Sequence, residues 1–515
     1  MLKISKVKNA YKEIEDVIGS DYITNKDFMK AAYSRNVDPA FPDRWADIIV
    51  RPETTEDVSE IVKVANKYKL KMVPRGGGAD LVGGSTTQGG ILLDITRMNQ
   101  IHEINVDDYY CIVGCGITWG AMLSELQKKG MTTGILGPGS GYSATIGGGL
   151  SNATVGFCST KYGVVPDICL GVEVVLPNPE GTIIRTGAAS NQYATPFCRY
   201  GVSPDFTGIF MGDVGVMGVK TKAFLRLFPD PPHKARRYYM LLKDDYDSVF
   251  KLAHKMRKET GDGLNDLMVW PSILFQLLST QVVNKPSTRA KITGPVFSVT
   301  LEATDQRILD VYLEKTNEIM LKDEVTRPFE WQEIDLDMAH SNDWKFTLKE
   351  EFHFFQKYIS TAPPKTSMTT CHKVAISKLN EAVQKGIQFS RDYSKEFPPK
   401  NPPLPVFASF LMFLPNGNCV IVGGLGGDNT DEHREASMNI WHKKIRHQAR
   451  YGGAHYWLGE SISQSIVEAG AFTPEYMQFF KDMKKAVDPN YILSPNKFHM
   501  YSYDHDYTQH LVKDE

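Results

Sequence analysis

The sequence has no excess of charge of either sign. Its 515 residues contain 58 Lys and Arg against 60 Asp and Glu, which gives a formal net charge of −2. A surface that binds nucleic acid or an anionic membrane through its charge requires a basic excess that is absent here. We therefore expect no nucleic acid among the partners of this protein.

Long apolar runs are also missing. No uninterrupted run reaches the roughly 20 residues that a membrane-spanning helix needs. The first residues, MLKISKVKNAYKEIEDVIG, mix Lys and Glu with apolar residues. They lack the apolar core and the small-residue cleavage site of a signal peptide. The sequence thus predicts no membrane span and a cytoplasmic location.

The sequence has no clustered metal ligands. Its 7 cysteines are scattered and odd in number, with no C-x-x-C pair. A zinc or iron–sulfur site is therefore not expected, and we expect the cysteines to be buried thiols. His433, His442 and His447 have helical spacing, but the Lys and Arg around them favour a solvated, charged helix over a metal site. We predict no metal site. If the protein transfers electrons, we expect no metal centre of its own to carry them.

Glycine, by contrast, is dense in three places. Glycine-rich loops at about 75–85, 134–149 and 212–218 each follow a predicted strand. The first, in PRGGGADLVGG, closes a predicted strand–helix–strand unit, yet it matches neither the dinucleotide fingerprint nor the P-loop. One such loop is more often a turn. Three in one region favour a large phosphate-bearing nucleotide held by backbone N–H groups. Arg75 and Asp80 either contact phosphate or cap turns.

The length predicts more than one domain. Strands and helices alternate with glycine at the turns, which indicates the α+β class. The segment FPDPPHKARR, 228–237, gathers proline and charge, and glycine becomes sparser after it. We place a boundary there.

The ordered segments PRGGGADLVGG, GILLDITRMNQIHEIN, PGSGYSATIGGG, YGVVPDICLGVEVVLPN and GDVGVMGVKTKAFLRL resemble the FAD domain of the vanillyl-alcohol oxidase and p-cresol methylhydroxylase superfamily. The resemblance implies that family's two-subdomain FAD-binding fold with an α/β cap. It implies an FAD-binding domain over 1–230, a substrate cap over 231–455, and a segment, 456–515, that returns to the FAD domain.

The end of the chain resembles the same family. AVDPNYILSPNK, 486–497, is similar to its terminal FAD-contacting segment. The resemblance implies these cofactor-binding residues: Pro74, Arg75, Gly76, Gly77, Gly78, Ala79, Asp80, Leu81, Pro138, Gly139, Ser140, Ala144, Thr145, Gly147, Gly148, Asn152, Tyr162, Gly163, Gly215, Gly218, Val219, Asn496 and Lys497.

The segment YGGAHYWLGE, 451–460, is placed like the family's active-site segment. Tyr456 falls on the family's tyrosine, and His455 and Trp457 flank it as further catalytic candidates. Trp457 stands where the family has arginine, Leu81 or Val82 where it has a tyrosine, and Val164 near its aspartate. Because those groups bind a phenolate in the family, the resemblance implies a different, rather apolar substrate. Tyr456 is left either as a base or as a group that positions substrate.

The family's tethering histidine is also replaced, since Asn416 to Asn418 stand in its region and offer no nucleophile. We expect non-covalent FAD, with His372 as the one alternative tether. The expected function is an FAD-dependent dehydrogenase or oxidase. It would take hydride from an activated C–H or a carbinol carbon of a small, fairly apolar molecule.

Electrons would pass to an external acceptor: oxygen, a cytochrome or an electron-transfer flavoprotein. The alternatives are a D-2-hydroxy-acid dehydrogenase of the lactate or glycolate type, and a flavin-bearing, non-catalytic partner subunit. We expect a homodimer or a hetero-oligomer.

Overall fold

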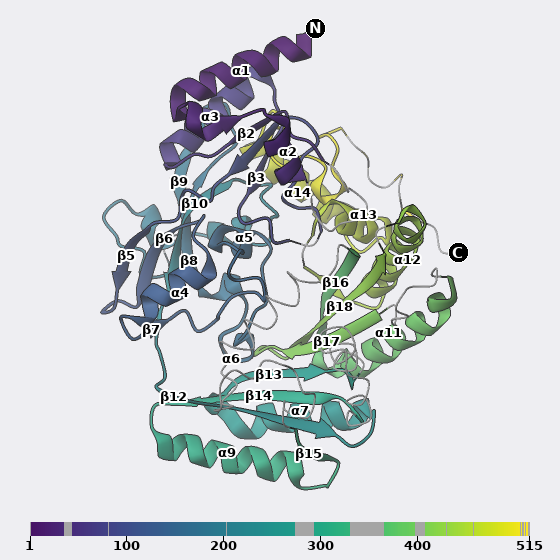
Figure 1. Ribbon diagram of the computed structural model, residues 1–515. Coiled ribbons are helices and arrows are strands. Elements are labelled where there is room, and N and C mark those ends of the chain that lie inside the picture. Colours follow the sequence, from purple (N-terminus) through teal and green to yellow (C-terminus); the bar gives the residue numbers. More distant parts are fainter. Residues whose placement is uncertain are drawn as a thin grey trace.

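Three main β-sheets organise the chain in this computed structural model (Figure 1). The structure describes residues 2–34, 44–80, 82–201, 203–272, 293–329, 365–396, 407–428, 430–456, 458–504, 506, 509 and 511–512. Two of the sheets lie in the upper, N-terminal part of Figure 1, and the third and largest lies below them.

The first sheet contains a parallel core. Its strands in order are β1 (Ile23–Thr24), β2 (Ile48–Val50), β4 (Ile91–Asp94) and β3 (Met72–Arg75). Helix α3 (Thr55–Tyr68) connects β2 to β3 and completes the expected strand–helix–strand unit. The helix begins where Thr54 and Asp57 form a reciprocal capping box, which satisfies backbone N–H groups that a helix start leaves open. β3 ends at the first glycine loop.

The second sheet is antiparallel. It consists of β5 (Ile101–Asn105), β6 (Tyr110–Gly114), β10 (Val219–Arg226), β8 (Cys169–Val175) and β9 (Ile183–Arg185), in that order. All residues of β8 are buried, and most of its apolar residues pack in the core that the second sheet shares with the first sheet and the surrounding helices. The surrounding helices are α1 (Leu2–Ile18), α2 (Asp27–Ser34), α4 (Trp119–Gln127), α5 (Ile146–Ser151) and α6 (Ser159–Tyr162). A short ribbon pairs β7 (Met131–Thr132) with β11 (Phe228–Pro229).

The third sheet is antiparallel and has 8 strands. Their order is β15 (Thr326–Pro328), β12 (His233–Leu241), β14 (Val296–Ala303), β13 (Leu264–Trp270), β17 (Phe407–Phe413), β18 (Asn418–Asp428), β16 (Lys365–Ala375) and β19 (Ala454–His455). Alternation along β13 sends Leu267 and Val269 to the face covered by helices, and Met268 and Trp270 to the opposite face, towards the first two sheets.

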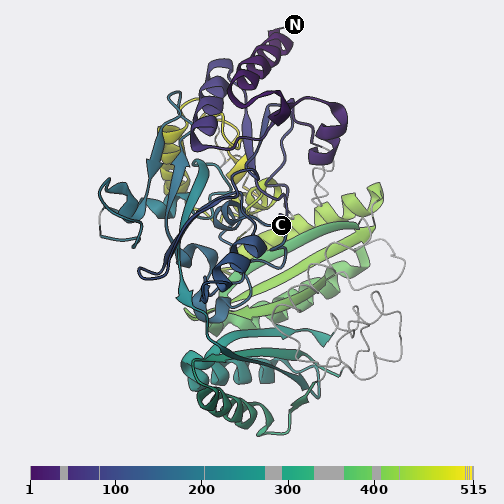
Figure 2. The same cartoon turned by 60° about the vertical axis from the view of Figure 1, so that its left-hand side comes forward.

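Helices cover the outer face of the third sheet (Figures 1 and 2). They are α7 (Tyr246–Thr260), α9 (Gln306–Leu321), α11 (Leu379–Tyr393) and α12 (Asp431–Arg450). After β19 the chain forms α13 (Glu460–Glu468) and α14 (Pro474–Val487) and runs back to the first sheet, where Leu493 bridges to Met72.

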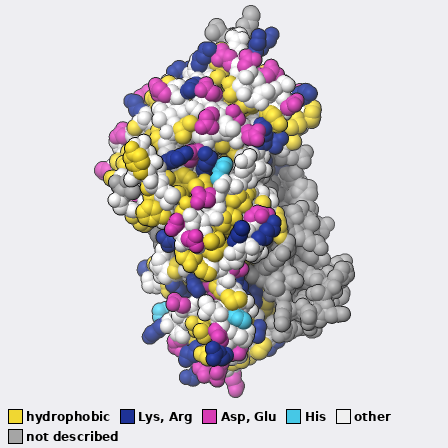
Figure 3. All heavy atoms as spheres, turned by 90° about the vertical axis from the view of Figure 1, so that its left-hand side faces the viewer, with side chains coloured by type: hydrophobic (Ala, Val, Ile, Leu, Met, Phe, Trp, Pro, Cys, Tyr) yellow, Lys and Arg dark blue, Asp and Glu magenta, His cyan; other side chains and the backbone are white. Residues whose placement is uncertain are grey.

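The α+β class expected from the sequence is confirmed by this mixture of sheets and helices. The domain limits at 230 and 455 stay a prediction, although the second sheet ends before β12 begins the third. The face turned to the left of Figure 1 carries acidic and basic side chains interspersed with hydrophobic ones (Figure 3).

Helix α12 differs from the solvated helix that its charges suggested. Its residues His433, Trp441 and Ile445 are buried, because the helix lies between the third sheet and α13. Within the described part of the chain, no group of 3 or more His, Cys, Asp and Glu side chains is arranged to hold a metal ion. The expected absence of a metal site stays a prediction.

Candidate functional site

A cavity of about 450 Å³ lies between the glycine loops and the inner face of the third sheet. All three glycine loops reach it. The residues expected from the sequence that line it are Pro74, Arg75, Gly76, Gly77, Gly78, Ala79, Asp80, Pro138, Gly139, Ser140, Ala144, Thr145, Gly147, Gly148, Asn152, Gly215, Gly218, Val219 and Tyr456. The sequence therefore identified most of the loop side of this cavity.

The first two glycine loops are packed directly against each other. A methyl group at Gly77 would overlap the carbonyl oxygen of Ser143, and one at Gly76 would overlap the side chain of Thr145. Thr145 in turn caps α5 by accepting a hydrogen bond from the Gly148 N–H at 3.3 Å. Close approach of backbone to backbone is thus one reason for the glycines, since any larger side chain would separate the loops.

Arg75 and Asp80 hold the first loop in shape. The Asp80 carboxylate accepts hydrogen bonds from the N–H of Gly84 at 2.7 Å and from the Ser85 hydroxyl at 2.5 Å. The Arg75 guanidinium donates to the Ser85 carbonyl oxygen at 3.2 Å. Both residues therefore cap turns, and both also line the cavity. No described residue accepts a hydrogen bond from the N–H of Gly76, Gly77 or Gly78.

The third loop is organised by a buried ion pair. Lys220 Nζ lies 2.7 Å from Asp213 Oδ1, and both side chains are buried. Asp213 also accepts the Gly215 N–H at 3.1 Å, and Lys220 donates to the Ser151 hydroxyl at 2.9 Å. Gly215 has a φ of 71°, in the left-handed region that glycine adopts without strain. These contacts fix the loop where it borders the cavity.

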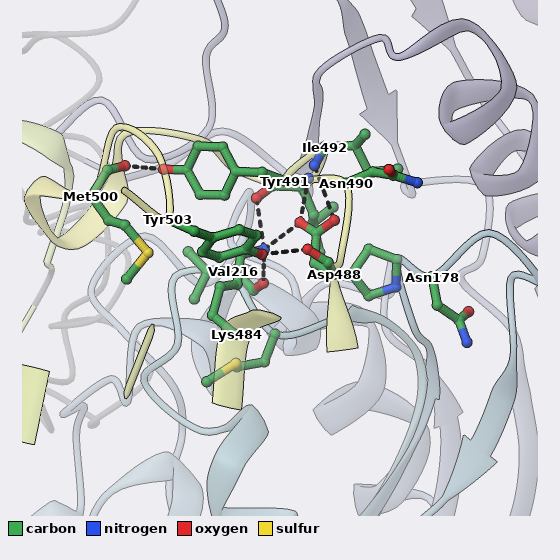
Figure 4. A network of polar contacts seen from close by, with 12 residues as sticks. Asn178, Val216, Lys484, Asp488, Asn490, Tyr491, Ile492, Met500 and Tyr503 are labelled. Carbon is green, nitrogen blue, oxygen red and sulfur yellow. Dashed lines mark hydrogen bonds and ion pairs between the residues drawn. The ribbon is translucent and has the colours of Figure 1, made fainter. Parts of the chain in front are cut away.

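Hydrogen bonds connect the terminal segment to the glycine loops (Figure 4). Lys484 Nζ donates to the Val216 carbonyl oxygen at 2.6 Å and to Asp488 Oδ2 at 2.6 Å. The backbone of Ile492 accepts from the Met72 N–H at 2.7 Å, beside the start of the first loop. Lys497 donates to the Gly83 carbonyl oxygen at 3.2 Å. Neither Asn496 nor Lys497 is among the cavity-lining residues, so this segment positions the loops.

The opposite wall of the cavity is apolar and comes from the third sheet. Met268 and Trp270 project from β13, Phe410 and Met412 from β17, and Val422 from β18. The rings of Trp270 and Phe410 are stacked, with centroids 5.2 Å apart and planes 19° apart. None of these residues was expected from the sequence. β13 is buried along its whole length, so no alternation of apolar and polar residues marks the face that meets the cavity.

Tyr456 closes the edge of this wall. It follows β19, its N–H donates to the Cys371 carbonyl oxygen at 3.2 Å, and its side chain is only 6% exposed. Burial, with the Cys371 thiol in hydrogen-bond contact, raises the pKa of Tyr456 well above its usual value. The hydroxyl therefore keeps its proton at neutral pH. A neutral phenol can donate a hydrogen bond but is a poor base.

A lysine lies beside this tyrosine. Lys373 Nζ is 5.8 Å from the centroid of the Tyr456 ring. Burial lowers the pKa of Lys373, while Cys371 and Asp167 act in the opposite direction. Lys373 and Cys371 lie on the same face of β16, because two residues separate neighbours on one side of a strand. Lys373 was not among the residues expected from the sequence, and it does not line the cavity.

The other expected site residues lie elsewhere. His455 faces the helix side, where its Nε2 is 3.0 Å from Gln448 Oε1 and its ring stacks on His372. Tyr162 donates to Glu302 Oε1 at 2.6 Å and so links α6 to the third sheet. Neither residue lines the cavity, nor does Gly163. Leu81 and Trp457 lie outside the described residues.

The arrangement fits FAD in its chemistry. N–H groups without a described acceptor border one end of the cavity, as the phosphates of a nucleotide require. Stacked aromatic and aliphatic side chains border the other end, as a flat organic ring and a small apolar substrate require.

Comparisons with known proteins agree with this assignment. Residues 46–187 match the family of FAD binding domains. The chain is 32% identical over 228 residues to the glycolate oxidase subunit GlcD of Bacillus subtilis (strain 168), a match that spans 44% of this chain and 46% of that protein. The chain thus spans about half the length of this curated relative.

Solved structures share the fold over nearly the whole chain. The 4-ethylphenol oxidase of Gulosibacter chungangensis superposes with a TM-score of 0.79 at 18% identity, covering 96% of this chain and 98% of that one. Substrate-bound p-cresol methylhydroxylase superposes with a TM-score of 0.78 at 17% identity, covering 96% and 97%. At such identities the likeness establishes the fold, which is the one expected from the sequence.

The family match identifies FAD as the cofactor of this chain, and it confirms the resemblance of the first two glycine loops, which lie within the matched residues, to an FAD binding domain. As for membranes, the described helices include none whose length and apolarity would allow it to cross a bilayer.

Proposed function

We propose that this protein is an FAD-dependent oxidoreductase that takes hydride from an activated C–H or a carbinol carbon of a small, fairly apolar molecule. The observation that carries the proposal is that one cavity joins the glycine loops to the apolar wall of Met268, Trp270, Phe410, Met412 and Val422. A substrate on that wall would lie against the flavin end of the bound cofactor.

When bound, FAD supplies a hydride acceptor. The loop backbones hold the nucleotide part, and the ion pair of Lys220 and Asp213 keeps the third loop in place. The apolar wall excludes water from the substrate carbon, which protects hydride chemistry. The Tyr456 hydroxyl, which keeps its proton, donates a hydrogen bond and orients the substrate.

We propose that FAD is bound without a covalent bond. No described Cys or His side chain lines the cavity. His372 is turned towards the end of α12, where its Nε2 is 2.8 Å from the Tyr451 hydroxyl. Asn416 and Gly417 lie in the exposed turn between β17 and β18, and Asn418 begins β18. Acid precipitation should release all of the yellow colour. Flavin fluorescence that stays on a denaturing gel band would overturn the proposal.

Anaerobic flavin bleaching tests the reaction. The FAD-loaded protein is mixed with a panel of alcohols, alkylphenols, terpenoid hydrocarbons and D-2-hydroxy acids, and the visible absorbance is followed. We expect bleaching by a neutral, apolar member of the panel. A protein that takes up no FAD would contradict the whole proposal, and bleaching by D-lactate alone would contradict the substrate class.

A D-2-hydroxy acid is the second candidate, and two observations favour it. The curated relative is a glycolate oxidase subunit, and the ammonium group of Lys373, just behind the cavity-lining Tyr456, is 5.8 Å from the centroid of its ring. The Lys373→Met variant separates the candidates. It should raise KM strongly if the substrate is a carboxylate, and leave KM nearly unchanged if the substrate is neutral.

The remaining expectations stay proposals. A flavin-bearing partner subunit without activity is the alternative if no compound bleaches the flavin.

The acceptor is oxygen, a cytochrome or an electron-transfer flavoprotein, and oxidation of the photoreduced protein by each distinguishes them. Light scattering tests the expected homodimer or hetero-oligomer, and cell fractionation tests the cytoplasmic location.

A further inference from the structure

A second cavity, of about 600 Å³, lies behind the first. Its wall comes from the third glycine loop, the segment between α12 and β19, and helices α13 and α14. This volume falls within the range of sites that hold small organic molecules. None of the residues expected from the sequence to bind cofactor lines it, whereas His455 does.

The two cavities share a thin wall. Asp213 lines the second cavity, and the next residue, Val214, lines the first. In the same way, His455 lines the second cavity and Tyr456 the first. Consecutive Cα atoms are only about 3.8 Å apart, so at two places a single peptide unit separates the two spaces. The second cavity is nevertheless a distinct site with its own chemistry.

Its wall offers no net charge to a ligand. No Lys or Arg is among the described residues that line it. The one carboxylate, that of Asp213, is engaged by Lys220 and by backbone N–H groups. Burial lowers the pKa of His455 to about 4, so its imidazole is neutral near pH 7. A carboxylate, a phosphate or an ammonium ion would lose its hydration here without a compensating partner.

The wall is instead rich in aromatic rings. Phe472 and Tyr476 are stacked, with centroids 5.3 Å apart and planes 20° apart. The ring centroids of Phe480 and Phe498 are 4.8 Å apart. At the mouth, Tyr476 is 53% exposed and Phe479 is 63% exposed. Large rings that stay this exposed around a cavity mark a binding site more often than a folding core. They also match the flat faces of an aromatic ligand.

We propose that the second cavity binds a neutral, planar aromatic molecule of two-ring size, with a quinone as the representative class. The hydroxyl of Tyr476 is the only side-chain hydroxyl among the described lining residues, and it supplies a hydrogen-bond donor for a ligand carbonyl at the mouth. This site is independent of the reaction proposed for the first cavity.

The test uses the FAD-loaded protein and measures binding directly, by titration calorimetry with dimethylnaphthoquinone. Saturable binding of one molecule is expected, and the anionic naphthalene sulfonate should bind more than about tenfold more weakly because no cation faces it. Tyr476→Ala, at an exposed position, should weaken binding on the order of fivefold through the lost aromatic contact. Ala449→Trp, which places a large ring inside the cavity, should weaken it more than about tenfold.

Two controls keep the result specific. Tyr193→Ala removes a ring that is 89% exposed and outside the cavity. This variant should bind dimethylnaphthoquinone with the same affinity as the wild type. Val422→Phe narrows only the first cavity and should also leave the affinity unchanged. Loss of binding in Val422→Phe with retention in Ala449→Trp would place the ligand in the first cavity. That result, or no saturable binding, would overturn the inference whatever the enzyme oxidises.

Discussion

Lys484 Nζ lies 2.6 Å from Asp488 Oδ2, and the two side chains are 3% and 0% exposed. The same ammonium group reaches the carbonyl oxygens of Val216 and Leu493. Through its bond to Val216, Lys484 joins the terminal segment to the third glycine loop (Figure 4). Burial lowers the pKa of Lys484, and Asp488 and Asp213 oppose this shift.

Breaking this pair should destabilise the protein. Lys484→Met leaves the Asp488 carboxylate buried without its cation, and removal of one partner of a buried pair typically costs about 3–5 kcal/mol. We expect a lower midpoint of thermal unfolding and weaker retention of FAD. Lys485→Met is the control, because Lys485 is the exposed neighbour on the same helix. Equal midpoints in the two variants would show that the pair contributes nothing specific.

Tyr456→Phe tests the hydroxyl at the cavity edge. Loss of a hydrogen bond to substrate should slow flavin reduction about 5- to 150-fold, the equivalent of about 1–3 kcal/mol. Because the pKa of Tyr456 is raised well above its usual value, the variant should keep the same pH profile between about pH 6 and 9. Rapid-mixing spectroscopy measures both, with Tyr451→Phe as the control outside the cavity. A pH limb that disappears in Tyr456→Phe would instead identify the tyrosine as a base.

Lys444 should make stability depend on pH. Burial lowers its pKa to about 7, whereas the unfolded chain binds the proton with a pKa near 10.5. Between these values the unfolded state holds more protons, so stability should rise with pH from about 7 to 10. In Lys444→Met the rise should be smaller, and the variant should be more stable at neutral pH. Lys443→Met, on the exposed side, should keep the rise. The midpoint of thermal unfolding is measured against pH for the wild type and both variants. If it changed with pH in the same way in all three proteins, Lys444 would not be the group responsible.

Gly77→Ala tests the contact between the first two loops. The added methyl group would overlap the Ser143 carbonyl oxygen, and such overpacking costs about 1–3 kcal/mol. We expect FAD affinity to fall, measured by fluorescence titration. Gly386→Ala is the matched control, because nothing lies within 4 Å of its added methyl group. In α11 it should stabilise the protein by about 0.5–1 kcal/mol. Unchanged FAD affinity in Gly77→Ala would show that the loops can separate without cost.

The loop side of the cavity was predictable because its signal is local. Glycine density near 75–85, 134–149 and 212–218 can be read within a few residues. The first two loops follow β3 and β7 as expected, whereas the third follows a 3-10 turn at Phe206–Phe210 and leads into β10. Arg75 was left between two roles, and the structure shows the turn-capping contact with Ser85. No local signal could show that Gly77 meets Ser143, because that contact depends on how two separate loops approach each other.

The substrate side was not predictable in the same way. The third sheet is buried on both faces, so Leu267 and Met268 are equally apolar in the sequence although they face opposite sides. His455 and Tyr456 were expected together, but successive residues of an extended segment point in opposite directions. Only Tyr456 reaches the first cavity. The burial of α12 was likewise hidden, since its cover comes from β16, β18 and α13.

The backbone hydrogen bonds between the terminal segment and the first sheet set an order of events during synthesis. The N–H of Met72 bonds to Ile492, and the N–H of Ser494 bonds back to Met72. These partners are more than 400 positions apart in the sequence. A nascent chain can therefore form the strand–helix–strand unit early, but it cannot fasten the glycine loops until residues 484–494 have left the ribosome. Productive loading of the flavin is expected only after that stage, and a chain stalled before it should emerge colourless.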